Sequence, residues 1–340
     1  MRIPKYLEKN DTIGFIAPAF GCNIEPYHTA FGNALKKFQA SGYQLELGNN
    51  CYEGKGIGIS NTPEKCGEEV NDMFIRGQAG AVFSCGGGEL MCEILDFVDF
   101  DGIGHAEPKW FVGYSDNTNL TFLLATLCDT AAVYAPCAPA FGMEPWHDCL
   151  HDLMGILTGV KKEVAGYPLW EKESLKDEDH PLEPYHVTEK RVLRVFPEQR
   201  DTALEGRLLG GCLDCLSNLV GTEYDRVAQF SERYQEDGII WYMEACDLNV
   251  MSIRRALWQL DHAGWFRHVR GFLFGRPLCH GQEMFGIDQY RAVTDVLGKY
   301  RVPILMDLDI GHIPPAMPVV NGAYARVETE GNEIRVSYSL

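Results

Sequence analysis

The sequence predicts an α/β fold in two parts: an N-terminal part built on a parallel sheet, and a smaller C-terminal part of mixed strands and helices. Three observations lead to this prediction. Strand and helix patterns alternate through the first half, a charged segment with two prolines follows at 171–190, and mixed patterns resume after it. A chain of 340 residues also exceeds the usual size of one domain.

The alternation in the first half is regular. Apolar runs predict buried strands at 12–17, 43–47, 81–85 and 110–112. Helices are expected between them, because apolar residues recur at helical spacing before Ser41-Gly42, and because Thr62-Pro63 is a strong helix start. Strands that alternate with helices form right-handed crossovers, which give a parallel sheet covered on both faces.

A boundary follows the first half. Ten of the twenty residues from 171 to 190 are charged, and no helix or strand period is visible among them. The segment is therefore expected to be an exposed linker or a long loop. We place the N-terminal domain at 1–165, the linker at 166–190 and the C-terminal domain at 191–340.

The second half mixes strand and helix patterns without regular alternation. Residues 205–211 predict a short strand and a turn. Further strands are expected at 238–243, 269–274 and 302–306, and helices at 253–265 and 287–300. Alternating polar and apolar residues at 324–328 predict antiparallel edge strands near the end.

Composition excludes several classes of protein. Hydrophobic residues make up 46 % and charged residues 23 %, which is typical of a folded protein with a sizeable core. A net charge of −18 argues against a nucleic-acid partner and against anionic membranes, both of which attract an excess of Lys and Arg. Neither a signal peptide nor an apolar stretch of about 18 residues is visible. A cytoplasmic protein whose twelve cysteines are reduced is expected.

The strongest functional signal lies at 110–116, WFVGYSD. An apolar strand ends at Gly113, and a helix with leucines on one side begins after Ser115. A serine at such a sharp turn is lifted out of the sheet, and the first free N–H groups of the helix face the same point. This favours a nucleophile whose developing oxyanion meets ready donors, one of them the N–H of Asp116. The same pattern also describes an ordinary capped helix start.

Gly86-Gly87-Gly88 follows a neighbouring strand of the predicted sheet. Ligands collect at the carboxyl ends of parallel strands, and glycine lets backbone amides approach a ligand closely. The run suits a second oxyanion donor opposite Asp116. A phosphate-binding turn and a plain tight turn are the alternatives, although the run matches neither nucleotide-binding glycine motif.

A nucleophilic serine needs a base, and the base needs an orienting carboxylate. Glu244 is the first polar residue after a buried strand, although it could also cap the next helix. His312 lies between Gly311 and Pro314-Pro315, which restrict the backbone around its imidazole. The pair Cys212 and Cys215 forms a CxxC without a second pair at zinc spacing, so neither a metal nor a redox cofactor is expected.

Several segments together resemble one family. They are 13–18 (IGFIAP), the glycine loop after Ser84, 113–118 (GYSDNT), Gly210-Gly211 before a helix, Glu244 after a strand, and Gly311-His312 with Pro318 downstream. Taken in this order, they resemble the LD-carboxypeptidase family of serine peptidases, which includes the microcin C self-immunity peptidases. The resemblance runs through nearly the whole chain.

The resemblance implies a Rossmann-like N-terminal domain and a C-terminal domain of the swivelling β/α/β type, with the active site between them. It implies the catalytic residues Ser115, Glu244 and His312, and an oxyanion hole made by the amides of Asp116 and of Gly87 or Gly88. It further implies a homodimer that needs no metal.

The resemblance leaves the substrate open between a murein L,D-tetrapeptide and a microcin C-like peptidyl or aminoacyl nucleotide. Murein-cleaving members usually read GGYG where this chain has Gly86-Gly87-Gly88-Glu89, and the long loop is closer to the microcin-immunity branch. Trp170 in that loop could stack on a nucleotide base or could pack at an interface.

The sequence therefore predicts a serine carboxypeptidase-type hydrolase that cleaves an amide bond near the carboxyl end of a small peptide. Two alternatives stand beside it. One is a peptide- or nucleotide-binding protein without chemistry. The other is an esterase of the α/β-hydrolase type, for which the elbow motif G-x-S-x-G lacks its last glycine, since Asn117 stands there.

Overall fold

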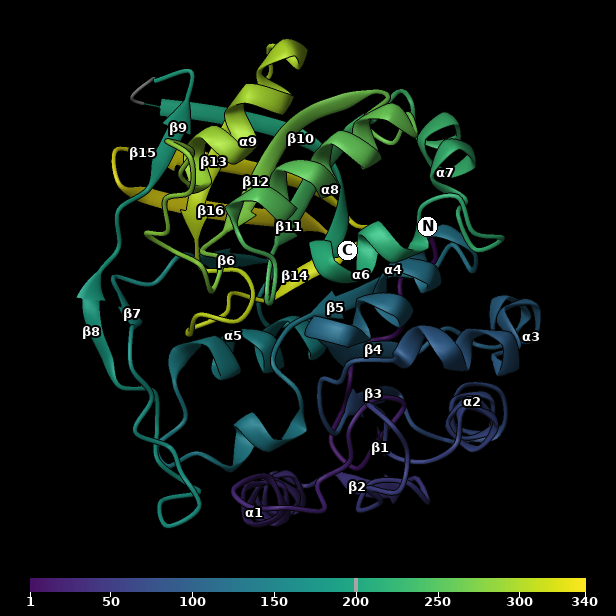
Figure 1. Cartoon of the computed structure of the whole chain (residues 1–340). Coiled ribbons are helices and arrows are strands. Elements are labelled where there is room, and N and C mark those ends of the chain that lie inside the picture. Colours follow the sequence, from purple (N-terminus) through teal and green to yellow (C-terminus); the bar gives the residue numbers. More distant parts are fainter. Residues whose placement is uncertain (199–200) are drawn as a thin grey trace.

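The computed structural model describes residues 1–198 and 201–340, and it confirms the predicted α/β fold class. Two sheets lie one above the other (Figure 1). The lower sheet has the strand order β14-β5-β4-β3-β1-β2. Its strands are β1 (Thr12–Ile16), β2 (Gln44–Leu47), β3 (Ala81–Ser84), β4 (Trp110–Gly113), β5 (Ala132–Tyr134) and β14 (Val319–Asn321). β1 to β5 are parallel, as predicted, and β14 is antiparallel to β5.

The helices of this layer begin where the sequence signals lie. α2 starts at Pro63, and the side chain of Thr62 caps it by accepting from the N–H of Lys65. A π-helical turn carries it on to Gly77, the predicted end. The helices are α1 (Tyr27–Ala40), α2 (Pro63–Asn71), α3 (Phe100–His105), α4 (Thr118–Thr126) and α5 (Asp148–Leu157), with short turns η2 (Met91–Phe97), η3 (Ser115–Asn117) and η4 (Ala138–Gly142).

α4 lies between the two sheets, which explains why all nine of its residues are buried. Its Phe122 ring stacks on Trp265 of the upper layer, with centroids 5.4 Å apart. A helix buried on every side reads as uniformly apolar rather than amphipathic. The start of this helix, where the candidate nucleophile lies, is therefore held between the layers.

The upper sheet is mixed and has the strand order β6-β16-β15-β10-β11-β12-β13-β9. β10 to β13 run parallel, and the other pairs are antiparallel. The strands are β6 (Glu163–Ala165), β9 (Arg194–Phe196), β10 (Asp201–Cys212), β11 (Ile239–Glu244), β12 (Val269–Gly275), β13 (Ile304–Leu308), β15 (Tyr324–Glu330) and β16 (Glu333–Ser339). The helices of this layer are α6 (Leu213–Leu219), α7 (Val227–Arg233), α8 (Val250–His262) and α9 (Gln289–Leu297).

Two local predictions were wrong. Residues 205–211 belong to one twelve-residue strand, β10, and not to a short strand and a turn. Gly210 lies so close to β11 that a Cβ would come 1.7 Å from the carbonyl oxygen of Tyr242, so this glycine serves close strand packing. β15 and β16 are interior strands, because β6 covers β16 and β10 covers β15; β6 and β9 form the edges instead.

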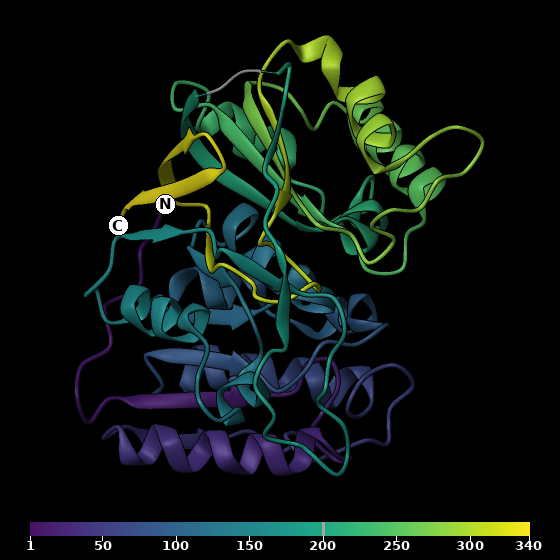
Figure 2. The ribbon, with the colours of Figure 1, turned by 90° about the vertical axis from the view of Figure 1, so that its left-hand side faces the viewer.

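The charged segment at 171–190 is a long loop whose two ends form short strands. β7 (Leu169–Glu171) and β8 (Val187–Lys190) pair as an antiparallel ribbon, which closes the segment into a long loop. The loop runs beside the lower layer (Figures 1 and 2). A pattern of a few residues flanked by charges is too short to show a strand period in the sequence.

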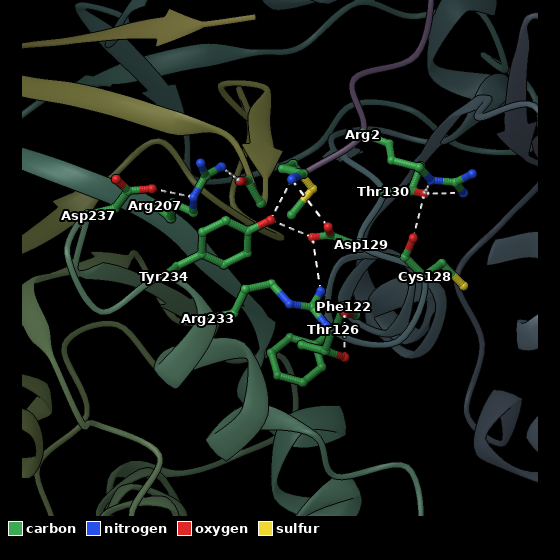
Figure 3. A network of polar contacts seen from close by, with 12 residues as sticks. Arg2, Phe122, Thr126, Cys128, Asp129, Thr130, Arg207, Arg233, Tyr234 and Asp237 are labelled. Atoms are coloured by element: carbon green, nitrogen blue, oxygen red, sulfur yellow. Dashed lines mark hydrogen bonds and ion pairs between the residues drawn. The ribbon is translucent and has the colours of Figure 1, made fainter. Parts of the chain in front are cut away.

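A polar network ties the two layers together beside α4 (Figure 3). Tyr234 donates its hydroxyl hydrogen to Asp129 at 2.6 Å, and Arg233 forms an ion pair with the same carboxylate at 3.4 Å. The guanidinium of Arg207 lies over the ring of Tyr234 and binds Asp237 at 2.6 Å. Asp129 precedes β5 of the lower sheet, whereas its partners come from the upper layer, so the network restrains their relative placement.

Among the described residues, no helix has the length and apolar character needed to cross a bilayer.

Candidate active site

Ser115 lies at the sharp turn between β4 and α4. Its φ of 64° is in the left-handed region, which non-glycine residues rarely adopt and which marks strained functional turns. The side chain of Asn117 fixes this turn, since it donates to the carbonyl oxygens of Gly86 at 2.7 Å and Tyr114 at 3.0 Å. The turn thus presents the serine hydroxyl beside the glycine loop, as the strand-to-helix pattern predicts.

Glu244 and His312 come from the upper layer. Glu244 is the last residue of β11 and is only 2 % exposed. His312 lies in the loop between β13 and β14, where Gly311 has a φ of 97°. A Cβ on Gly311 would lie 2.4 Å from Cγ of Glu244, so only glycine lets this loop approach the carboxylate. A buried ion pair between Arg276 and Asp309 holds the start of the loop.

The three side chains form one continuous chain of hydrogen bonds. Nε2 of His312 is 2.8 Å from Oγ of Ser115, and Nδ1 is 2.8 Å from Oε2 of Glu244. An ionised carboxylate can only accept, so Nδ1 carries a proton; when the ring is neutral, Nε2 accepts from the serine hydroxyl. The structure thus brings together the three residues that the sequence separates by up to 197 positions.

Burial and the neighbouring charge shift the pKa values of Glu244 and His312 in opposite directions. Burial alone would lower the pKa of His312, but the negative charge of Glu244 and the hydrogen bonds to the ring outweigh it and raise that pKa above its ordinary value. Burial alone would raise the pKa of Glu244, but the charge and the hydrogen bond of His312 outweigh it and lower the pKa. The carboxylate therefore stays ionised beside the imidazole.

The glycine loop lies directly against the candidate nucleophile. A Cβ on Gly87 would come 3.1 Å from Oγ of Ser115. The carbonyl of Gly87 is already used, since it accepts from the N–H of Phe20 at 2.7 Å. Its amide N–H has no acceptor within 1–198 and 201–340 and is available to a ligand. Gly88 instead packs inward, where a Cβ would come 2.9 Å from Cβ of Ala19. Of the two glycines, Gly87 is therefore the one that lies against the serine hydroxyl.

The carboxylate and the backbone N–H of Asp116 lie in different surroundings. Its carboxylate turns into the protein and accepts from the N–H of Met91 at 2.8 Å and from Asn119 at 3.0 Å, and burial raises its pKa to about 6. Its backbone N–H lies in the first turn of the helix, where amides lack a partner within the helix. The side chain thus anchors the turn to η2, while the amide is left for an incoming oxyanion.

A cavity of about 610 Å³ opens in front of Ser115 and His312. Its walls come from the glycine loop, from η4, from α6 and from the long loop, which contributes Lys176 and Tyr185. Trp170, for which base stacking and interface packing were both left open, is not among the residues that line it. The Trp170 ring instead lies 5.2 Å from the guanidinium carbon of Arg276 and in contact with His280. The aromatic residue that the long loop supplies to the cavity is Tyr185.

Sequence reasoning missed Tyr134, the last residue of β5. Its hydroxyl donates to Oε1 of Glu244 at 2.6 Å and accepts from the N–H of Ser115 at 3.1 Å. It therefore links the nucleophile turn to the buried carboxylate. In the sequence Tyr134 is one more large residue of a short apolar strand, and no local signal distinguishes it.

We expect Tyr134→Phe to lower kcat by about 10-fold, since a hydrogen bond to a charged group contributes about 1.5–3 kcal/mol. The free energy of unfolding should fall as well, because Glu244 loses one of its buried partners. Steady-state kinetics and thermal unfolding check both effects. Tyr242→Phe is the matched control: its ring packs on Tyr134, yet its hydroxyl has no partner among the described residues. An equal loss of kcat in Tyr134→Phe and Tyr242→Phe would contradict the proposed role of the Tyr134 hydroxyl.

The residues that could hold a metal overlap with this site. Among the described residues, one group of three potential ligand side chains lies close together, namely Cys212, Glu244 and His312.

Serine hydrolases as a class use a hydroxyl, an imidazole and a carboxylate joined in this order, and the three side chains here have that arrangement. The esterase alternative requires the three groups on one continuous sheet, whereas here Ser115 follows a strand of the lower sheet and Glu244 ends a strand of the upper one. The site lies where the two layers meet.

The chain belongs to the LD-carboxypeptidase family. The family's N-terminal domain matches residues 13–135, and its C-terminal domain matches residues 205–327. The chain is 24 % identical to the microcin C7 self-immunity protein MccF of Escherichia coli, over 97 % of this chain and 94 % of MccF. It is 26 % identical to a probable murein peptide carboxypeptidase of Bacillus subtilis, over 96 % of this chain and 91 % of that protein.

Solved structures share the whole fold. An MccF-like protein from Bacillus anthracis superposes with a TM-score of 0.83 at 21 % identity, covering 100 % of both chains. MccF in complex with glutamyl sulfamoyl guanosine superposes with a TM-score of 0.82 at 21 % identity, covering 99 % of this chain and 98 % of MccF. These likenesses agree with the predicted two-domain architecture.

Proposed function

We propose that this protein is a serine carboxypeptidase that hydrolyses an amide bond near the carboxyl end of a small peptide substrate. The observation that carries the proposal is the chain of 2.8 Å hydrogen bonds from buried Glu244 through His312 to Ser115 at the cavity wall. Membership of a family with relatives named as carboxypeptidases supports it.

The geometry suggests a role for each group. His312 Nε2 takes the proton of Ser115 as Oγ attacks the substrate carbonyl. Glu244 holds the imidazole in the tautomer that can accept this proton and stabilises its charged form. The amides of Gly87 and Asp116 bind the oxyanion, and each lost donor should cost about 10²- to 10³-fold in kcat. His312 then protonates the leaving amine, and a water molecule releases the acyl group from Ser115.

The cavity wall supports a substrate with a free carboxylate. Lys176 enters the cavity from the long loop, and its burial lowers the pKa of its amine while Glu171 opposes that shift. A partly buried ammonium needs an anionic partner, which a substrate carboxylate would supply. Tyr185 offers an aromatic surface beside it.

Two substrate classes follow from the relatives: a murein L,D-tetrapeptide and an aminoacyl or peptidyl nucleotide of the microcin C kind. Structures of MccF with aminoacyl sulfamoyl nucleotides support the second class. The test is to incubate the protein with a tetrapeptide ending in D-Ala and with an aspartyl sulfamoyl adenosine, and to follow both by mass spectrometry. Cleavage of either supports the proposal. Recovery of both ligands intact, with saturable binding, would favour a binding protein instead.

The raised pKa of His312 predicts the pH dependence. Only the neutral imidazole accepts the serine proton, and a raised pKa keeps the ring protonated to higher pH. We therefore expect kcat/KM to rise with pH, with a midpoint above the ordinary histidine value of about 6.5. Glu244→Gln removes the attracting charge and should move the midpoint down. A wild-type midpoint at or below 6.5, unchanged in the variant, would contradict this assignment.

We also propose that the protein is cytoplasmic and forms a homodimer. All twelve cysteines are free, which suits a reducing compartment. The dimer follows from the family resemblance, and sedimentation velocity would test it directly.

A further inference from the structure

Cys212 lies beside the candidate triad without taking part in the proposed hydrolysis. It is the last residue of β10, and in the parallel pairing of β10 with β11 it stands opposite Glu244. Its sulfur, a carboxylate oxygen of Glu244 and a ring nitrogen of His312 all lie within 4.8 Å of one another. The thiol forms no disulfide, is 1 % exposed and donates to Oδ2 of Asp214 at 3.3 Å.

Thiolate, imidazole and carboxylate are the three protein ligands that Zn²⁺ prefers. Bond lengths of about 2.0–2.3 Å around a tetrahedral ion place its ligand atoms roughly 3–4 Å apart. The present spacing therefore needs only small side-chain shifts. We propose that Zn²⁺ binds to Cys212, Glu244 and His312, and that it reversibly inhibits the hydrolysis proposed above. The inhibition rests on that proposed function, whereas the metal site does not.

The charges and protons balance at this site. Zn²⁺ replaces the thiol proton of Cys212, which passes to solvent, and the thiolate and the carboxylate together neutralise the ion. A neutral complex costs far less to bury than a lone cation. Tyr134 already donates to Oε1 of Glu244, so the carboxylate keeps a supporting hydrogen bond when Oε2 turns to the metal.

Zinc bonding at Nδ1 explains why the ion should inhibit. Nδ1 is the ring nitrogen that faces Glu244, at 2.8 Å from Oε2. When the metal takes the Nδ1 lone pair, the proton of the neutral ring must move to Nε2. Nε2 then donates to Oγ of Ser115 and can no longer accept its proton. The metal thus removes the general base without occupying the cavity.

Two further thiols, those of Cys215 and Cys246, lie near these three side chains, and Cys215 hydrogen-bonds with Cys212. Cys215 lies 3.6 Å from the carbonyl oxygen of Ser115 and 3.8 Å from Oδ1 of Asp116. Cys246 is half-exposed, contacts Asp247 at 3.9 Å and also hydrogen-bonds with His312, but it is not one of the three clustered ligand side chains. Cys215→Ala is the matched control for Cys212→Ala, because each variant removes one buried thiol of the same CxxC and only Cys212 belongs to the group of three potential ligands.

The experiment measures binding separately from hydrolysis. Isothermal titration of the metal-free protein with Zn²⁺ should give one site, and Co²⁺ should give a thiolate-to-cobalt charge-transfer band with tetrahedral visible bands. Cys212→Ala should abolish the charge-transfer band and weaken Zn²⁺ binding at least about 100-fold. Cys215→Ala should keep both. Zinc inhibition is then measured for each variant relative to its own zinc-free rate, and it should disappear in Cys212→Ala alone.

The outcomes separate the two proposals. The ligand set would be wrong if Co²⁺ gave no charge-transfer band, or if the two cysteine variants lost zinc affinity equally. Zinc that binds with the expected signature while hydrolysis continues unchanged would overturn the inhibition. A protein that binds zinc through Cys212 and hydrolyses neither substrate class when metal-free would support the metal site and would contradict the proposed function instead.

Discussion

Replacement of Ser115 by alanine is expected to lower kcat by about 10⁶-fold on whichever substrate the protein cleaves, because the members of a hydrogen-bonded triad act as a unit. The variant removes the atom that attacks the carbonyl, and His312 then has no proton to accept. KM should change little, because the cavity walls stay intact. Single-turnover kinetics and labelling with a serine-directed phosphonate, followed by peptide mass spectrometry, measure the effect and locate the adduct.

The control for Ser115 is Ser217→Ala. Ser217 lies in α6 and donates to the carbonyl oxygen of Leu213, so its loss tests a nearby serine without a catalytic contact. We expect nearly full activity and no change in phosphonate labelling. Turnover of Ser115→Ala within about 10-fold of the wild type would exclude the covalent mechanism.

Glu244→Gln is expected to lower kcat by about 10⁴-fold while leaving the fold intact. Glutamine keeps the shape of the side chain but has no charge to stabilise the imidazolium. Its amide can also donate to Nδ1, which selects the tautomer whose Nε2 cannot accept the proton of Ser115. Stopped-flow or end-point kinetics at several pH values would measure both the rate and the loss of the raised midpoint.

Glu69→Gln provides the comparison for Glu244. Glu69 is also a buried carboxylate, and it accepts from the N–H groups of Ala17 at 2.8 Å and Asn50 at 2.6 Å, apart from the three candidate catalytic residues. Its loss should lower the thermal unfolding midpoint and leave kcat within a few-fold of the wild type. A similar loss of kcat in both variants would show that the effect of Glu244→Gln is one of stability and not of catalysis.

Much of the lower layer could be predicted because its signals are local. The cap at Thr62 and Pro63, the end at Gly77 and the short apolar strands all act within a few residues. β10 was harder to predict. Its two glycines resemble a turn in the sequence, but in the fold they allow close packing against β11 and α4. Which strands form the edges of the upper sheet likewise depends on partners far away in the chain.

Some residues of the candidate site likewise have a local signal in the sequence, and others have none. Ser115 has a local signal in its strand-to-helix turn, and Glu244 has one as the first polar residue after a buried strand. Tyr134 has none, because its importance depends on a carboxylate 110 residues away. The sequence leaves Trp170 open between base stacking and interface packing; in the fold its ring, in the β7–β8 ribbon, lies near Arg276, and Tyr185 lines the cavity.

By itself, the sequence determined which residue types stand at strand ends and tight turns, since backbone preference and apolar periodicity act over a few residues. Only the tertiary structure decided which of these ends meet. It set Gly87 rather than Gly88 against the serine hydroxyl, and it placed the imidazole of His312 between groups from two different sheets. Hydrogen bonds act over about 3 Å and depend on direction, so pairings of this kind exist only once both layers have packed around α4.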